Sequence, residues 1–182
     1  NKKVDIAFLG AASYIRARDR GQVRVVVRTI RRRKLVYHGI IFVAKGSGIQ
    51  SLKDLKGKRF AFVDKESTAG YHYPRRLFLN AGVMPMKDME TIFAGSHHAV
   101  MHKVSMGEVD GGASFEGAEN MLVDSEKVVP IARTPAIITD PVVVRPGLSD
   151  KMVKKIRLAF LKASTHAEVK ECLAYANIDG FV

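Results

Sequence analysis

The chain has 182 residues, of which 47% are hydrophobic, and a formal net charge of +12. This composition supports a packed core and excludes a largely disordered protein. No apolar run reaches the roughly 20 residues that a membrane-spanning helix needs. A secretory leader is expected to be absent or already removed. The single cysteine, Cys172, cannot form an internal disulfide. We expect it to lie on an amphipathic helix, with its side chain in the protein core.

The positive charge is concentrated at the start of the chain. Residues 1–36 contain eleven Lys or Arg and two Asp, so they carry +9 of the total of +12. Such a block can bind nucleic acid or an anionic membrane. Here, however, valines are interleaved with Arg24 and Arg28, as in a strand with one solvated face. The run from Arg31 to Lys34 has no aromatic side chain to stack on bases. We therefore expect a solvated basic face, or one balanced by an acidic segment that is missing here, and no nucleic-acid partner.

Strand-like and helical segments alternate along the chain. The first third predicts a buried strand at 4–9, a helix at 12–18, strands at 22–29 and 35–44, and a helical turn at 51–55. The middle predicts strands at 59–63, 91–93, 109–114 and 128–132, with helices at 69–81, 98–106 and 116–123. The last part predicts a strand at 141–145 and helices at 150–163 and 166–176. This alternation predicts an α/β fold with parallel, doubly wound sheets.

A candidate anion site lies where the strand 59–63 meets the next helix. Ser67, Thr68, Ala69 and Gly70 open that helix, so its unpaired amides and two hydroxyls can surround a tetrahedral oxyanion. The alternative is that Ser67 or Thr68 only caps the helix.

A second polar cluster follows the strand 91–93. His97 lies at the carboxyl end of that strand, which is where ligands bind in open α/β sheets. It can equally be an exposed loop histidine. His98 and His102 are near neighbours, but no cysteine or HExxH pattern supports a metal site, and we expect none.

Signals for catalysis are weak. No nucleophile elbow, Walker A loop or dinucleotide fingerprint is present. Glu116 and Asp140 can be an acid and base pair, or two ordinary carboxylates near strand ends. We expect no catalytic residue and no cofactor.

The residues 51–62, SLKDLKGKRFAF, resemble the L-x-D-L-K-G-K-x-x-A-F signature of type II periplasmic binding proteins. With the STAGY run at 67–71 and the Pro-Arg pair at 74–75, the chain resembles the phosphonate, phosphite and phosphate-binding branch of that class. Further matching stretches are at 4–10 with 13–14, 95–97, 107–113 and 139–141.

The resemblance implies two α/β lobes joined by a hinge that closes on the ligand. Lobe one would comprise residues 1–45 and 142–182, and lobe two residues 46–141, with the hinge near 44–47 and 138–142. The family has roughly two βα units before the strand 4–9, so lobe one is expected to be incomplete at its N-terminus.

The resemblance also implies a set of ligand contacts. Ser67 and Thr68, with the amides at Ala69 and Gly70, would hold the phosphonate oxygens. Tyr14 and His97 would add hydrogen bonds. An amino group on the ligand would face Asp140, and Glu116 lies near a second acidic position of the family. Ala69 replaces a serine of the family pattern, which removes one hydroxyl.

The function implied is that of an extracytoplasmic solute-binding protein. It would capture a phosphonate, phosphate or phosphite for a membrane ABC permease, which it would contact transiently. It would be periplasmic, or lipid-anchored in a Gram-positive source. The alternatives are a ligand-sensing domain of a signalling protein and an enzyme that acts on a phosphorus oxyanion.

Overall fold

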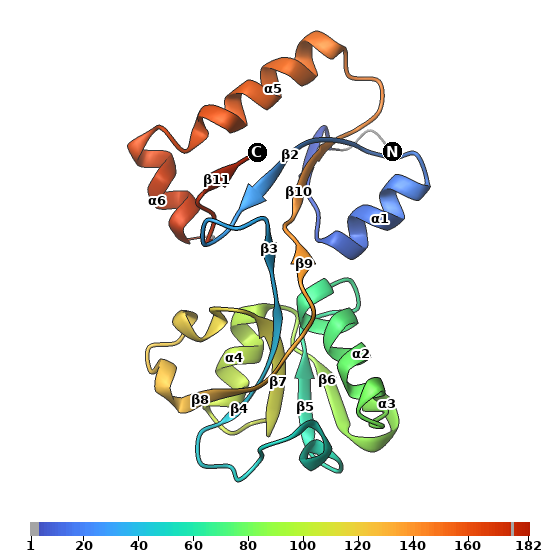
Figure 1. Ribbon diagram of the computed structural model, residues 1–182, viewed down its shortest axis with the longest axis vertical. Helices are drawn as coiled ribbons and strands as arrows, with labels where there is room; N and C mark the ends of the chain where they lie inside the picture. Colours follow the sequence, from blue (N-terminus) through green and yellow to red (C-terminus); the bar gives the residue numbers. More distant parts are fainter. Residues whose placement is uncertain (1–3, 176) are drawn as a thin grey trace. The chain divides into compact units, whose positions relative to one another are not determined.

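The computed structural model describes residues 4–175 and 177–182, and the chain divides into two compact units. Unit 1 comprises residues 1–37 and 138–182, and unit 2 comprises residues 38–137. The chain passes between the units twice, and the strands β3 (Val36–Tyr37) and β9 (Ile137–Ile138) at these crossings pair with each other (Figure 1). The sequence suggested boundaries at 45/46 and 141/142, but the strand that follows β3 belongs to the sheet of unit 2.

Unit 2 is built on a mixed five-stranded sheet with the order β6-β5-β7-β4-β8. Its strands are β4 (Gly39–Ala44), β5 (Arg59–Phe62), β6 (Glu90–Phe93), β7 (Gly111–Phe115) and β8 (Val128–Arg133). The strand β5 is parallel to β6 and β7, whereas β4 is antiparallel to β7 and β8. The prediction of a wholly parallel sheet was therefore wrong for β4. This strand follows β3 without a crossover helix, and it starts beside the ends of β7 and β8.

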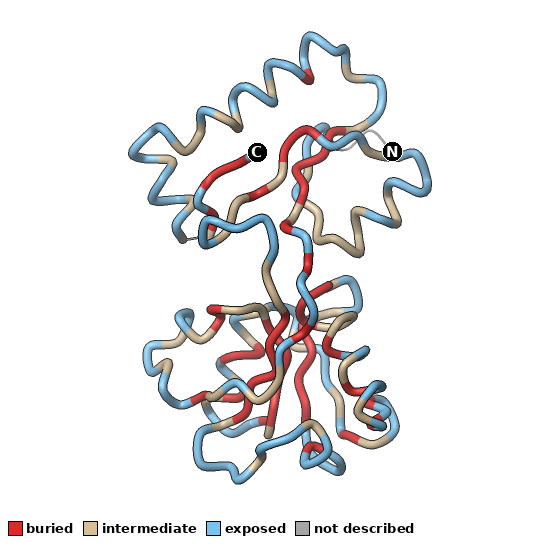
Figure 2. Tube along the Cα trace, in the orientation of Figure 1, coloured by how far each residue is buried: buried red, intermediate tan, exposed pale blue. Residues whose placement is uncertain are grey.

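Helical segments lie on both faces of this sheet (Figure 1). They are η1 (Leu52–Leu55), η2 (Thr68–His72), α2 (Tyr73–Asn80), α3 (Pro85–Asp88), α4 (His97–Ser105), η3 (Ala118–Met121) and η4 (Ser125–Lys127). Alternate residues of β4 enter different core clusters: Ile40 packs with the residues of α4, and Ile41 packs with Phe78 of α2. The buried stretches in Figure 2 accordingly follow β4, β5 and β7.

Unit 1 has a smaller sheet with the order β1-β10-β2-β11, in which neighbouring strands are antiparallel, so the prediction of parallel strands was wrong for this sheet. Its elements are β1 (Ile6–Phe8), α1 (Ala11–Asp19), β2 (Arg24–Ile30), β10 (Pro141–Val144), α5 (Asp150–Ala163), α6 (Ala167–Tyr175) and β11 (Gly180–Phe181). Val27 and Val142 form the centre of a core cluster that Phe160 and Phe181 extend. The predicted end of the last helix, Ala176, lies outside the described residues.

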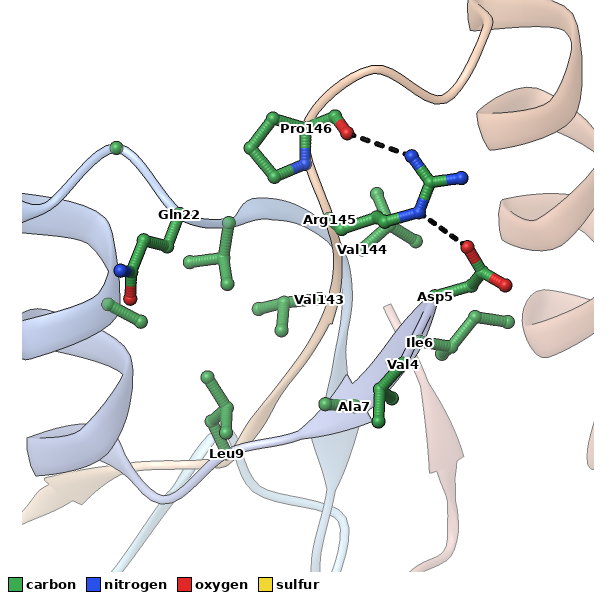
Figure 3. A pocket seen from close by; sticks show the side chains of 13 residues that line it. Val4, Asp5, Ile6, Ala7, Leu9, Gln22, Val143, Val144, Arg145 and Pro146 are labelled. Atoms are coloured by element: carbon green, nitrogen blue, oxygen red, sulfur yellow. Dashed lines mark hydrogen bonds and ion pairs between the residues drawn. The ribbon is translucent and has the colours of Figure 1, made fainter. Parts of the chain in front are cut away.

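A cavity of about 510 Å³ lies in unit 1 beside β1 (Figure 3). Its lining is mostly apolar, with side chains such as Leu9 and Val143. At its rim, Arg145 Nε donates to the Asp5 carboxylate at 2.6 Å and Nη1 donates to the Pro146 carbonyl. The prediction of a buried first strand was wrong, because β1 is an edge strand of three residues that pairs with β10 alone.

Three further predictions differ from the structure. The strand expected at 35–44 is interrupted at His38, which separates β3 from β4. The helix expected at 116–123 is reduced to η3, because Gly117 adopts a left-handed φ of 96° that no helix continues through. Cys172 is exposed on α6 rather than buried. Among residues 4–175 and 177–182, no helix has the length and apolar character needed to cross a bilayer.

Candidate functional site

The segment that follows β5 forms a tight helical start. Ser67 has an extended backbone, and its Oγ accepts a hydrogen bond from the Gly70 amide at 2.9 Å. The next residues form a turn of π-helix, in which the His72 amide bonds to the Ser67 carbonyl at 3.0 Å. Such turns are often found at functional sites. The structure therefore confirms a loop-to-helix junction at Ser67, and it also shows that Ser67 caps the helix.

Gly70 fixes this helical start to the end of the strand. The Gly70 carbonyl accepts a hydrogen bond from the Val63 amide at 3.2 Å. A Cβ at residue 70 would lie 2.3 Å from Val63 Cγ2 and 2.8 Å from Ser67 Oγ. Only glycine permits this approach, so Gly70 is required by packing as well as by any ligand.

The helical start lies against the first residue of β4. A Cβ at Gly39 would lie 2.8 Å from the Ala69 carbonyl oxygen. Gly39 is in turn held by Thr134, because its amide donates to Thr134 Oγ1 at 2.8 Å and its carbonyl accepts from the Thr134 amide. The ends of β5 and β8 and the start of β4 are thus tied together at one edge of the sheet.

His97 is the first residue of α4 and is bound to the neighbouring strand. Its Nδ1 lies 2.9 Å from the hydroxyl of Ser114, a fully buried residue of β7, and its ring lies 4.9 Å from that of Phe115. His97 is therefore an oriented side chain rather than an exposed loop histidine. Sequence reasoning missed Ser114; the signal was a single hydroxyl in an otherwise apolar strand, since a buried hydroxyl needs a partner.

Glu116 directly follows β7 at the same edge. Its amide donates to the His38 carbonyl at 2.9 Å, and its carboxylate accepts a hydrogen bond from Arg133 Nη2, also at 2.9 Å. Both side chains are partly exposed. Glu116 is thus an ion-paired residue, and Arg133 is a charged neighbour that the sequence did not indicate.

Asp140 lies in unit 1, just before β10, and it is also paired. Its carboxylate accepts from Arg31 Nη2 at 3.2 Å and from the Tyr37 hydroxyl at 3.4 Å. Burial raises the pKa of Asp140, and the charge and hydrogen bond of Arg31 oppose this shift without cancelling it. The burial of this carboxyl group therefore outweighs its pairing.

Tyr14 belongs to unit 1 as well, on α1, where the Arg18 guanidinium lies 5.9 Å from the centre of its ring. Tyr14 and Asp140 thus belong to one unit, and the other six expected ligand residues belong to the other unit. Within unit 2, the structure brings those six residues to the edge at which β5 and β7 end, because η2 packs against both β4 and β7.

The histidines of α4 were weighed above as metal ligands. His98 and His102 stack on each other with ring centres 6.4 Å apart. Within the described part of the chain, no group of three or more His, Cys, Asp or Glu residues is placed to hold a metal ion.

Comparison with known proteins identifies the family. The model of the family described as "ABC transporter, phosphonate, periplasmic substrate-binding protein" matches residues 1–182. The phosphonates-binding periplasmic protein of Escherichia coli is 27% identical over 181 residues, which cover 94% of this chain and 54% of that protein. The chain thus spans about half the length of this curated relative.

Two solved structures show the same fold. A binding protein component of an ABC phosphonate transporter from Pseudomonas aeruginosa is 29% identical with a TM-score of 0.87; the match covers 99% of this chain and 63% of that one. PhnD1 of Prochlorococcus marinus, solved with methylphosphonate, is 24% identical with a TM-score of 0.86, over 100% and 73% of the two chains. The predicted α/β binding-protein fold is confirmed, and the chain belongs to the family of periplasmic substrate-binding proteins of phosphonate ABC transporters.

Proposed function

We propose that this protein captures a phosphonate, or a related phosphorus oxyanion such as phosphate or phosphite, in the periplasm for an ABC importer. The observation that carries the proposal is the helical start at Ser67–Gly70 on the ligand-binding edge of the unit 2 sheet. Family membership supports it, and so does the P. aeruginosa structure, whose protein is named as a component of a phosphonate transporter.

The chemistry of the turn suits a tetrahedral anion. The first amides of a helix have no carbonyl partner within the helix, and the helix dipole places partial positive charge there. Ser67 Oγ accepts a bond from the Gly70 amide but keeps its own proton, so it can cap the helix and donate to a ligand at the same time. Thr68 is 4% exposed, whereas Ser67 is only partly buried, so we assign the larger contribution to the Ser67 hydroxyl.

His97 is proposed as a further donor. One ring nitrogen lies 2.9 Å from the Ser114 hydroxyl, which fixes the orientation of the ring. Tyr14 and Asp140, which lie in unit 1, stay predictions that rest on the resemblance alone.

Binding without catalysis is part of the same proposal. The two candidate carboxylates, Glu116 and Asp140, are each paired with an arginine. The family is one of substrate-binding proteins, and a transient partner in the form of a membrane permease follows from that role.

The test is isothermal titration calorimetry with methylphosphonate, phosphite and phosphate. We expect the Ser67→Ala variant to lose at least tenfold in affinity, because a hydrogen bond to a charged group contributes about 1.5–3 kcal/mol. Ser149→Ala is the matched control, since Ser149 caps α5 through the Met152 amide in the same way. Both variants should lose about 1 kcal/mol of stability, but Ser149→Ala should keep its affinity. An unchanged affinity of Ser67→Ala would contradict the proposal.

A further inference from the structure

Glu116, which the resemblance places near a second acidic position of the family, carries an arginine in this protein. It is bonded to Arg133 within unit 2. We infer that the protein selects phosphorus oxyanions that lack a cationic group, and that Arg133 sets this preference by neutralising Glu116. The inference rests on the proposed function, because it concerns the ligand of the same site.

The Glu116–Arg133 pair is fixed at both ends by the sheet. Arg133 is the last residue of β8 and lies opposite Ile40 of β4, while Glu116 follows β7 and donates its amide to the His38 carbonyl. Since β4 lies between β7 and β8, the ion pair crosses β4 at its start. This is where Gly39 touches Ala69. The pair is therefore a neighbour of the helical start at Ser67–Gly70.

This position determines what the site offers to a ligand. An ammonium group gains most from a carboxylate whose charge is not already compensated. The charge of Glu116 is already compensated by the Arg133 guanidinium at 2.9 Å, and this guanidinium would also repel an approaching ammonium group. An oxyanion, by contrast, is attracted by the guanidinium, which presents five N–H donors in total. The pair thus disfavours the ammonium of an aminoalkylphosphonate and tolerates a simple phosphonate.

The selectivity can be measured with methylphosphonate and 2-aminoethylphosphonate by isothermal titration calorimetry. We expect the wild-type protein to bind methylphosphonate at least tenfold more tightly. Arg133→Gln removes the charge that compensates Glu116, so it should lower the ratio of the two affinities at least tenfold. Arg133→Lys keeps the positive charge and should retain most of the preference. The matched control is Arg59→Gln: the Arg59–Asp110 pair is of similar exposure and also belongs to unit 2, and its loss should leave the ratio unchanged.

Two outcomes would overturn the inference, and they are distinguishable. Equal or tighter binding of 2-aminoethylphosphonate by the wild type, with a ratio that Arg133→Gln does not change, would refute the selectivity and leave the oxyanion site standing. Failure of the wild type to bind either ligand would refute the proposed function and the selectivity together.

Discussion

The two units differ in how completely their own side chains cover their sheets. Of the largest side chains that are almost completely buried, all but Val27 lie in unit 2. In unit 1, the apolar side chains of Val4 and Phe8 are exposed, and a cavity lies beside β1. Helices cover both faces of the unit 2 sheet, whereas β1 in unit 1 is a short edge strand (Figure 1). A rigid anion-binding turn is best built where the surrounding core is densely packed, and the Ser67–Gly70 turn is in unit 2.

The units also differ in charge. Unit 1 contains eighteen Lys or Arg and seven Asp or Glu, a net charge of +11, whereas unit 2 contains twelve and eleven, a net charge of +1. The basic block of residues 1–36 is thus joined by the lysines of α5, which are exposed. The proposed anion site of unit 2 therefore relies on local donors and on its helical start rather than on net charge.

The largest expected difference is between alanine substitutions of one phenylalanine in each unit. Phe62 is fully buried in β5, whereas Phe8 of β1 is 52% exposed. We expect Phe62→Ala to lower the free energy of unfolding by about 3–5 kcal/mol, because it leaves a cavity in a packed core. Phe8→Ala should cost about 1 kcal/mol, through its edge contacts with Phe160 and Phe181. Urea unfolding measures both, and equal costs would show that the two cores do not differ.

A smaller difference is expected between alanine substitutions of two glycines that both have ordinary backbone angles. Gly70→Ala places a Cβ 2.3 Å from Val63, while Gly180→Ala in unit 1 meets Ser164 Oγ at 3.2 Å. Overpacking should cost Gly70→Ala about 1–3 kcal/mol and Gly180→Ala a few tenths at most. Thermal unfolding of the two variants tests this, and a tolerated Gly70→Ala would mean that the turn can move away from β5.

The elements best predicted from sequence were those with strong local signals. The helix expected at 150–163 has these bounds in the structure, and Ser149 caps it through the Met152 amide, because a serine before an amphipathic run offers the missing hydrogen bond locally. The antiparallel course of β4 was missed, since strand direction is set by contacts distant in sequence. The same holds for the candidate site. The Ser67–Gly70 turn was found because its signal is local, whereas Arg133 was missed because it meets Glu116 only across β4.

The aspartates of two Arg–Asp pairs, one in each unit, should have pKa values that are shifted in opposite directions. A side-chain hydrogen bond from Arg59 lowers the pKa of Asp110 in unit 2, whereas burial raises the pKa of Asp140 in unit 1. Asp110 therefore stabilises the fold above its usual pKa, and this contribution is lost as the pH falls. For Asp140, the free energy of unfolding falls as the pH rises from the usual pKa of an aspartate to the raised pKa of Asp140. NMR titration of the carboxyl carbons measures both.

Removing the arginine sharpens this contrast. Arg31→Gln should raise the pKa of Asp140 further, because the guanidinium opposes the effect of burial. Arg59→Gln should raise the pKa of Asp110 toward its usual value. If Arg31→Gln left the pKa of Asp140 unchanged, the pairing described for unit 1 would be wrong.

The smallest expected effect is on the response to salt. A net charge of +11 makes unit 1 repel itself, and this repulsion is screened as the Debye length falls from about 30 Å at 0.01 M to about 8 Å at 0.15 M salt. Hydrogen exchange at Val27 and Val142 should therefore slow when salt is added, by a factor of a few, while exchange at Ile41 and Phe62 stays the same. A uniform response would show that the charge difference has no effect on stability.

The central claim, that the helical start after β5 holds a phosphorus oxyanion, is tested most directly by NMR. Backbone amide resonances are followed while methylphosphonate is added to the protein. We predict that the amides of Thr68 and Ala69 move most, with a saturable dependence on ligand, because a hydrogen bond to an anion shifts an amide proton strongly. The Gly70 amide, which donates to Ser67 Oγ, should move less. The amides at the start of α5, behind Ser149, should not move. Saturable shifts confined to other elements, with Thr68–Gly70 unaffected, would contradict the claim.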